Sequence, residues 1–342
     1  MELAPFIVCP ETLGPLEPRD GGYWSPLAER LYPVREDLVF MGYPQRDAAM
    51  IAETMEEEHD WQGTAEVAAR NLEYVRANAA RAVDFINMIR PLVDVDGRPP
   101  RALELGCGNG WVSWLLAEAG FETWMCDFES NSLATGLNLK HPNIGDGRRF
   151  VVDARYPPIA DGSMDLVLFK EFVHHVSDHE PLFREANRVL RKGGLMAMME
   201  PLRSVRQRIY EIRHPDPHKG HHMTSARDYL RSIRRAGFEI ARQAYVYEER
   251  SGQRPLAVRM RRRAISAIDP SRTTGDWFTR LHFHLIGGAQ LVVMARKARE
   301  VQPPERPAMT PISPDSLDLE DQDLRPYGEF PAVLGEAATR LE

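Results

Sequence analysis

The sequence predicts an α/β protein built on a doubly wound, mainly parallel β-sheet. From residue 101 onward, short apolar runs alternate with amphipathic stretches at helical spacing, which is the pattern of repeated βα units. A glycine-rich segment, residues 103–110, joins the first apolar run to the first helical stretch. The chain has 342 residues and 43% of them are apolar, so it can bury a full core as one large domain or two small ones.

Two segments precede the alternating region. Residues 1–45 are rich in Pro and Gly between short apolar pieces, which predicts a small β-rich module of hairpins. Residues 46–98 are predicted to form a helical cover, because Ala, Glu, Arg and Leu dominate there and apolar residues recur at helical spacing. Pro91 is expected to end the last of these helices.

Residues 99–298 carry the alternating pattern itself. Strands are predicted at residues 101–105, 121–127, 148–154, 164–169, 195–201, 238–249 and 287–298. Helices are predicted at residues 111–120, 129–141, 177–194 and 225–237. Ser177 and Glu180 have the spacing of a capping box at the start of the third helix. An insertion at residues 249–286 separates the last two strands and could serve as a lid.

The last segment, residues 299–342, is an acidic tail with seven prolines and little apolar periodicity. We expect it to be largely disordered or draped over the surface. Residues 300–342 contain ten Asp or Glu against three Arg, which accounts for the whole net charge of −7. The remaining 40 acidic and 40 basic residues balance, so the body of the protein lacks the excess positive charge of a general nucleic-acid-binding protein.

Cysteine usage and hydropathy predict a cytoplasmic protein with no membrane partner. The three cysteines, Cys9, Cys107 and Cys126, cannot form a disulfide framework. No apolar run approaches the roughly 18 residues that a membrane helix needs. The N-terminus also lacks the basic start and apolar stretch of a secretion signal.

The most informative segment is LELGCGNG, residues 103–110, between a predicted strand and a predicted helix. Gly106, Gly108 and Gly110 carry no Cβ atom, so a ligand can approach the backbone closely. The start of the following helix favours a carboxylate or a phosphate. The dinucleotide fingerprint G-x-G-x-x-G is not met, because Trp111 occupies its third glycine position.

This G-x-G-x-G pattern, preceded by Glu104, resembles motif I of the class I S-adenosylmethionine (SAM)-dependent methyltransferases. The resemblance continues in order through WMCDFE, FVVDARYPPIADGSMD, MDLVLFKEFVHHV and REANRVLRKGGLMAMMEP, and it covers about residues 101–200. It implies a Rossmann-like fold with SAM as the cofactor. Five motifs in the order and spacing of the family are far more specific than one glycine loop.

The resemblance implies roles for residues that follow the second and third strands. Asp127 would accept hydrogen bonds from both ribose hydroxyls, the role of an acid at this place in nucleotide-binding folds. Phe128 would line the adenine face, or pack in the core. Asp153 would contact the adenine amino group, with the backbone N–H of Ala154 beside it, or would instead form an Asx turn.

The resemblance also implies which residues contact the methionine end of the cofactor. Glu104 would orient the methionine amine, directly or through water. Lys170 and Glu171 would line the same end or pair with each other. The complete set of predicted cofactor-binding residues is Glu104, Gly106, Cys107, Gly108, Gly110, Asp127, Phe128, Asp153, Ala154 and Lys170.

His174 and His175 are the candidate catalytic residues. Methyl transfer from a sulfonium depends mainly on proximity and alignment. A base is needed only when the acceptor is a hydroxyl, a protonated amine or an acidic carbon. Both histidines follow the fourth strand, which faces the methyl group in the family's fold, and either could act as that base. The alternative is that they cap the loop by hydrogen bonding.

A second group of histidines, His214, His218, His221 and His222, lies in a loop rich in Pro and Gly. His221 and His222 are predicted to contact the substrate, with a plain surface loop as the alternative. No metal is predicted, because the spacing is not that of H-E-x-x-H and no acid is clearly placed to join the histidines.

Residues 1–45 resemble the zinc-ribbon-like or Trm112-like segment fused ahead of some methyltransferases. Zinc-binding forms use four thiolates, whereas only Cys9 is present, so we expect a degenerate, metal-free form. Some ribosomal-RNA methyltransferases carry an intact version. Phosphate could be contacted by the basic run Arg259, Arg261, Arg262 and Arg263, with Arg231, Arg234 and Arg235 elsewhere. This keeps RNA open as an alternative acceptor.

These observations together predict a SAM-dependent methyltransferase that acts on an O, N or C atom of a small-molecule metabolite or natural product. One alternative is a methyltransferase of RNA or protein. Another is a non-methylating SAM-binding protein on the same fold. The N-terminal helices could also pair two subunits in a homodimer.

Overall fold

The computed structural model describes residues 2–47, 65–93, 95–205, 209, 222, 224–247, 289–317 and 325–342. The insertion at residues 249–286, with its run of arginines, lies outside the described residues. The same is true of His214, His218 and His221, and of residues 48–64 within the predicted helical cover.

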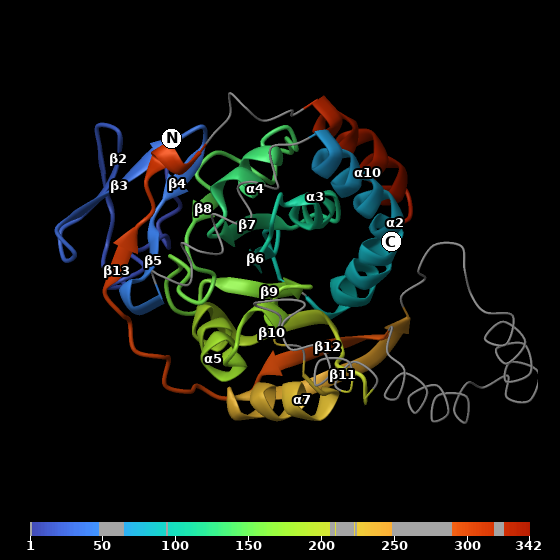
Figure 1. The fold of residues 1–342 in the computed structure, drawn as a ribbon. Helices are drawn as coiled ribbons and strands as arrows, with labels where there is room; N and C mark the ends of the chain where they lie inside the picture. Colours follow the sequence, from blue (N-terminus) through green and yellow to red (C-terminus); the bar gives the residue numbers. More distant parts are fainter. Residues whose placement is uncertain are drawn as a thin grey trace, which may run out of the picture.

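One sheet of 11 strands, in the order β1-β2-β3-β4-β8-β7-β6-β9-β10-β12-β11, runs through the molecule (Figure 1). Its main strands are β6 (Arg101–Leu105), β7 (Glu122–Asp127), β8 (Arg149–Val151), β9 (Met164–Lys170), β10 (Leu190–Pro201), β11 (Phe238–Tyr247) and β12 (Ala289–Lys297). The pairs from β8 to β10 are parallel, and β12 runs antiparallel to both its neighbours. The chain winds outward from β6 in one direction and from β9 in the other, which confirms the predicted fold class.

The central strands are largely apolar on both sides because the sheet is covered on both faces. Every residue of β9 is buried. Leu166 and Leu168 of β9 belong to the hydrophobic core on one face, whereas Val167 and Phe169 belong to the core on the other. This alternation follows the two-residue period of side chains along a strand.

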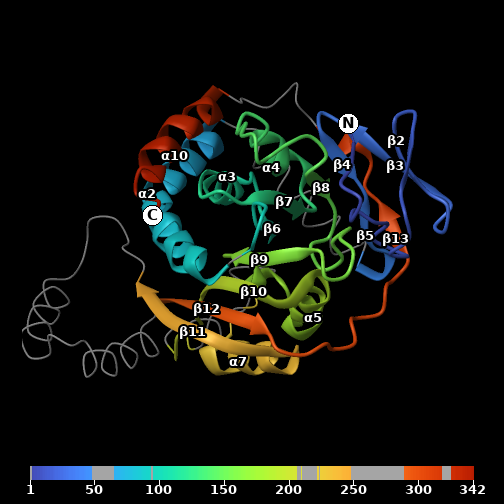
Figure 2. The ribbon, with the colours of Figure 1, turned by 180° about the vertical axis from the view of Figure 1, so that it is seen from behind.

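Helices form a layer on each face of the sheet (Figure 2). The core on one face contains residues of α2 (Ala65–Ile89), α3 (Trp111–Glu118), α4 (Ser130–Thr135) and α10 (Phe330–Ala338). The core on the other face contains residues of α5 (His179–Val189) and α7 (Ala226–Arg235).

The N-cap of α5 is Asp178, whose carboxylate accepts the N–H of Glu180 at 3.2 Å. The predicted cap at Ser177 is therefore wrong by one residue, because Asp178 supplies the extended backbone and the acceptor directly before the helix.

The N-terminal segment contributes β1 (Glu17–Arg19), β2 (Gly22–Ser25), β3 (Arg30–Arg35), β4 (Leu38–Phe40) and β5 (Gly42–Pro44). β4 pairs in parallel with β8, so β1 to β4 extend the central sheet. Cys9 is buried with its Sγ 3.2 Å from the hydroxyl of Tyr32. That hydroxyl donates a hydrogen bond to Glu11, whose carboxylate also pairs with Arg30 at 2.7 Å.

The acidic tail is an ordered part of the fold where the structure describes it. β13 (Met309–Pro311) pairs with β5, and α10 packs against α2 with Phe330 and Leu334 fully buried (Figure 1). Arg306 joins the segment to α5 through an ion pair of 2.5 Å with Glu185. Of the two expectations for this segment, the described residues fit the one in which it is draped over the rest of the fold, and not the disordered one. A few apolar side chains bury themselves against distant elements, which the average composition of the tail does not reveal.

Candidate functional site

The glycine-rich loop lies between β6 and α3, at the carboxyl edge of the parallel strands. The neighbouring strand on one side is β7 and on the other is β9, so the loop sits where the winding of the sheet reverses. This is the place where open α/β sheets bind ligands. Gly106, Gly108 and Gly110 have φ values of +69°, +54° and +76°, in the left-handed region that side chains disfavour.

The three glycines face different surroundings. A Cβ on Gly106 would lie 1.9 Å from the ring of Phe172, and one on Gly110 would lie 2.8 Å from Sδ of Met125. A Cβ on Gly108 would meet no atom within 4 Å. Gly106 and Gly110 are therefore needed for packing within the protein, whereas Gly108 is the loop glycine that leaves room for a ligand.

We expect Gly106→Ala to lower the free energy of unfolding by about 2–5 kcal/mol, because it adds an overpacked contact to the left-handed strain. Gly108→Ala adds only the strain of a side chain at a left-handed φ, so it should lower the free energy of unfolding by about 1–2 kcal/mol. Urea denaturation would measure both. Gly120→Ala is the control, since Gly120 has a φ of +89° and open space but lies outside the loop. Equal losses at Gly106 and Gly108 would show that the contact with Phe172 carries no energy.

Asp127 ends β7 and connects the glycine loop to the start of α4. Its Oδ2 accepts the N–H of Gly108 at 2.7 Å and its Oδ1 accepts the N–H of Glu129 at 3.1 Å. Burial raises the pKa of Asp127, and these backbone N–H groups oppose that rise. The structure thus brings the predicted ribose-binding carboxylate into direct contact with Gly108, which of the three loop glycines is the one that faces open space.

Asp153 lies close by, but its carboxylate is already paired. Arg155 binds it through several hydrogen bonds, the shortest 2.6 Å, and also binds Asp47 at 2.6 Å. An adenine amino group would share Asp153 with this guanidinium. Ala154 is buried, and Phe128 is half-buried against the core beside α3 and α4. Sequence reasoning missed Arg155 and Asp47.

Glu104, in β6, is a buried carboxylate at the base of the glycine loop. Ser113 of α3 donates a hydrogen bond of 2.6 Å to its Oε2. Burial raises the pKa of Glu104 to about 7, although the Ser113 hydrogen bond and the charge of Lys170 act in the opposite direction. A buried carboxylate of this kind gains most from a cation that binds beside it.

Lys170 ends β9 and is buried beside Trp111, 4.9 Å from Nζ to the ring centre. Its Nζ lies 3.0 Å from the carboxylate of Glu171 and 3.1 Å from the hydroxyl of Tyr74. Burial lowers the pKa of Lys170 to about 8, with Glu104 opposing the change. The predicted pairing of Lys170 with Glu171 is present. Tyr74 comes from α2, 96 residues earlier, and no sequence signal pointed to it.

The two candidate catalytic histidines lie in a short turn, η3 (Val173–His175), after β9. His174 is buried and its Nδ1 lies 2.8 Å from Oε2 of Glu200. His175 is exposed, and the centres of the two rings are 4.3 Å apart. The structure therefore separates two neighbours in sequence into one buried and one exposed imidazole.

Glu200, at the end of β10, holds this turn in place and was missed by sequence reasoning. Its fully buried Oε1 accepts the backbone N–H groups of Phe172 and Val173, each at 2.7 Å. An acid at the end of an otherwise apolar strand was the signal that could have revealed it. A carboxylate only accepts hydrogen bonds, so the contact with Glu200 favours the tautomer of His174 that has its proton on Nδ1 and its lone pair on Nε2.

The second group of histidines is represented by His222 among the described residues. Its backbone N–H donates a hydrogen bond to the carbonyl of His174, and its side chain is exposed. The structure thus brings His222 next to the candidate catalytic turn.

Within the described residues, no group of three or more His, Cys, Asp or Glu side chains could hold a metal. The helices of that same part of the chain are all too short or too polar to cross a membrane.

The donor set fits the cofactor that the sequence resemblance implies. Gly108 has open space on its Cβ side and Asp127 stands directly beside it, which suits a ribose diol. Glu104 is a buried carboxylate that forms no ion pair within the described residues, although the charge of Lys170 acts on it. Such a carboxylate suits an ammonium group. Glu104 lies near the end of β6, Asp127 ends β7, and Gly108 lies in the loop after β6, so all three are at the carboxyl edge of the sheet.

Comparison with known proteins places the chain in a family. A family model described as "Methyltransferase domain" matches residues 72–243. The demethylmenaquinone methyltransferase of Beutenbergia cavernae is 31% identical over 144 residues, which cover 42% of this chain and 58% of that protein. The malonyl-[acyl-carrier protein] O-methyltransferase of Hahella chejuensis is 31% identical over 29% of this chain and 36% of its own length. The chain thus matches well under two thirds of the length of these relatives.

Solved structures give a similar picture at lower identity. A SAM-dependent methyltransferase from Methanosarcina mazei has a TM-score of 0.44 and 19% identity, covering 62% of this chain and 98% of its own. A geranyl diphosphate methyltransferase in complex with SAM has a TM-score of 0.45 and 20% identity, covering 69% and 92%. The family model covers half of the chain and spans the doubly wound sheet from β6 into β11. The chain therefore belongs to the class I SAM-dependent methyltransferase family, whose cofactor is SAM.

Proposed function

We propose that this protein transfers a methyl group from SAM to an O, N or C atom of a small molecule. The observation that carries the proposal is the contact between Asp127 and Gly108 at the switch point of the sheet, with Glu104 buried beside it. Relatives named for demethylmenaquinone and for ubiquinone biosynthesis support a small-molecule acceptor.

Each part of the site has a role in this proposal. SAM, when bound, supplies a methyl group on a sulfonium that is a good leaving group. Asp127 holds the ribose hydroxyls, and Glu104 holds the methionine ammonium. Gly106, Cys107 and Gly110 shape the loop. Phe128, Asp153 and Ala154 border the adenine, and Lys170 borders the methionine end.

His174 is proposed as the base that takes a proton from the acceptor. Its Nδ1–H is given to Glu200, so Nε2 is the nitrogen that can accept a proton. His175 and His222 are proposed to contact the acceptor, because both lie beside His174. The predicted helical cover is part of the same proposal, since α2 brings Tyr74 to Lys170 and closes that side of the site.

The proposal is tested with SAM labelled in its methyl group. The purified protein is incubated with a panel of hydroxyl, amine and acidic-carbon acceptors, and separately with RNA and with denatured protein. We expect label only in the small-molecule fraction, and His174→Ala to lose most of it. Label in RNA or protein would favour the macromolecular alternative. SAM binding with no transfer to any fraction would favour a non-methylating protein.

Binding of S-adenosylhomocysteine (SAH) is expected to strengthen as the pH rises from about 6 to about 8. Its ammonium is held by ionised Glu104, whose pKa of about 7 leaves less of this form as the pH falls. Lys170, with a pKa of about 8, loses its competing positive charge in the same direction. Calorimetric titrations in buffers of different ionisation enthalpy should show that the protein releases up to about one proton for each SAH bound at pH 6.5.

Glu104→Gln is the control for this pH dependence. The amide of this variant does not titrate, so SAH should bind the variant more weakly than wild type. The remaining dependence of SAH affinity on pH should be the part that Lys170 contributes above about pH 7. A wild-type affinity that is flat over the whole range would show that Glu104 does not hold the ammonium.

A further inference from the structure

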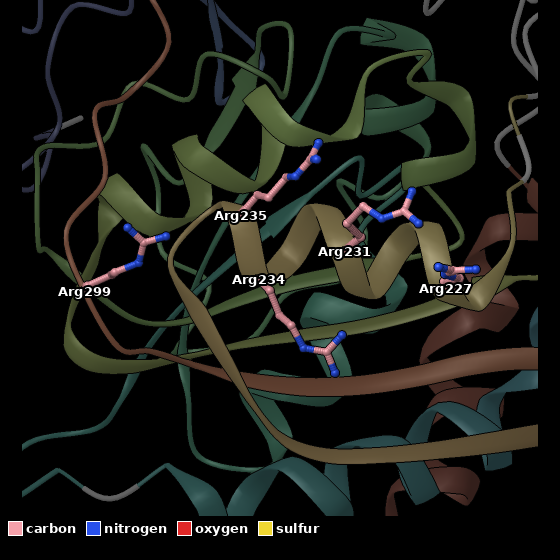
Figure 3. A pocket seen from close by; sticks show the side chains of 5 residues that line it. All are labelled: Arg227, Arg231, Arg234, Arg235 and Arg299. Carbon is pink, nitrogen blue, oxygen red and sulfur yellow. The ribbon is translucent and has the colours of Figure 1, made fainter.

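Five arginines line one hollow of about 370 Å³ on the outer face of α7 (Figure 3). They are Arg227, Arg231, Arg234 and Arg235 of α7, and Arg299 directly after β12. All five are exposed, and we call them the arginine face. The opposite side of α7 is apolar, with Tyr229, Leu230 and Ile233 buried.

The arginine face carries an excess of positive charge. Asp228 pairs with Arg231 at 3.0 Å, and Glu180 lies 3.8 Å from Arg235 while also binding Arg184. The described part of the chain places no carboxylate in ion-pair contact with Arg227, Arg234 or Arg299. Residues 1–299, which include these five arginines, have balanced charge, so this excess is local rather than a consequence of a basic protein.

Folding alone does not account for these arginines. Arg234 and Arg235 lie in the last turn of α7, where positive charge stabilises a helix, but Arg227 and Arg231 lie before that turn. Arg227 and Arg231, and likewise Arg231 and Arg235, are like charges four residues apart, a spacing that slightly destabilises a helix. An anionic partner would remove that repulsion and explain why the positions are arginines.

The arrangement suits an extended partner with several negative charges. The guanidinium groups point in different directions along the helix rather than converging on one point (Figure 3). A ten-residue helix is about 15 Å long, which is too wide a spacing for one phosphate. Among the described residues, no aromatic side chain lines the hollow, so that lining lacks the stacking platform of single-stranded nucleic acid. The same described lining has no apolar side chain, which membrane burial would need.

We propose that the arginine face docks an acidic helix of a partner protein. Carboxylates on one side of such a helix repeat every three to four residues, as Arg227, Arg231 and Arg234 do. Arginine binds carboxylates through two parallel hydrogen bonds, which gives this contact geometric specificity.

The arginine face lies near the side of the candidate site where the methyl acceptor is proposed to bind. α7 begins after its cap, Ser225, and the preceding Thr224 accepts the N–H of Arg203 at 3.1 Å. His222, two residues further back, contacts the turn of His174. A helix docked along α7 therefore lies next to the segment that borders the candidate catalytic turn, away from the loop that would hold the adenine.

The test uses a fluorescent alanine-based helical peptide with Glu at helical spacing on one face. Controls are the same peptide with Gln in place of Glu, a single-stranded RNA, and phosphatidylserine vesicles. We expect the acidic peptide to bind at least about tenfold more tightly than each control at low salt, and to weaken as salt rises. Fluorescence anisotropy measures the peptides and RNA, and cosedimentation measures the vesicles.

The variant is Arg227→Glu with Arg234→Glu, because neither arginine has an ion pair to lose among the described residues. It should weaken peptide binding at least about tenfold, and the milder double change to Gln should weaken it less. Arg19→Glu on β1, exposed and far along the sheet, is the matched control and should change nothing.

Three results would overturn the proposal: binding of RNA or vesicles as tight as that of the acidic peptide, unchanged peptide binding by the double variant, or no binding of the peptide at all. SAH titration of the same proteins reports separately on the cofactor site. The double variant should bind SAH as wild type does, so a failure of the docking proposal is distinct from a failure of the proposed methyl transfer.

Discussion

Asp127→Ala is expected to weaken SAH binding about 100-fold or more. A hydrogen bond to a charged group contributes about 1.5–3 kcal/mol, so losing two to the ribose amounts to about 3 kcal/mol at least. Every 1.4 kcal/mol corresponds to about tenfold in affinity. The substitution also releases the N–H of Gly108, which Asp127 holds at 2.7 Å, so the glycine loop loses its fixed geometry.

Calorimetric titration of SAH measures this effect. Asp127→Asn keeps one carbonyl oxygen as an acceptor and should lie between wild type and Asp127→Ala. Asp84→Ala is the matched control, because it removes an exposed carboxylate of α2 that pairs with Arg340 and has no part in the proposed cofactor site. Circular dichroism would confirm that each variant is folded. An unchanged affinity in folded Asp127→Ala would place the cofactor elsewhere.

Glu200→Ala is expected to lower the free energy of unfolding by about 3–5 kcal/mol. Glu200 is fully buried, and its loss leaves the backbone N–H groups of Phe172 and Val173 and the ring N–H of His174 without their acceptor. Water cannot replace a buried carboxylate that is bound on several sides. Urea denaturation measures the loss, and Glu239→Gln, an exposed acid on β11, should change stability by less than about 0.5 kcal/mol.

Glu200→Gln separates the structural role from the chemical one. The amide fills the same space and its oxygen accepts backbone N–H groups, so the loss of stability should be about 1–2 kcal/mol. Its amide N–H can face Nδ1 of His174, which favours the tautomer with the proton on Nε2. Nitrogen-15 spectra of the histidine ring would show this change. If the ring keeps its proton on Nδ1 in Glu200→Gln, Glu200 does not set the tautomer.

Local patterns were sufficient for the doubly wound fold class and for the residues at the centre of the candidate site. The apolar runs that became β6, β7, β9 and β10 have the two-sided burial expected of parallel strands. Gly108 and Asp127 were both predicted, and the structure puts them in contact. This worked because a loop between a strand and its helix, and an acid directly after a strand, are features of short stretches of chain.

Contacts between distant segments were not predictable in the same way. Tyr74 reaches Lys170 across 96 residues of chain, and Glu200 reaches His174 across 26. The tail was expected to be disordered or draped over the surface. Composition averages over its length and does not show that Phe330 and Leu334 become buried where α10 packs against α2.

The amino-acid pattern alone specified the doubly wound fold, the glycine loop and the acidic residues that follow its strands, since periodicity and turn chemistry act over a few neighbouring residues. The tertiary structure decided that His174 is the imidazole that contacts Glu200 and that Arg155 pairs with Asp153. It also decided that Arg299 lies beside the arginines of α7. Those outcomes depend on how elements pack across the sheet. Burial and the spacing of charges in three dimensions are set only when distant parts of the chain come together.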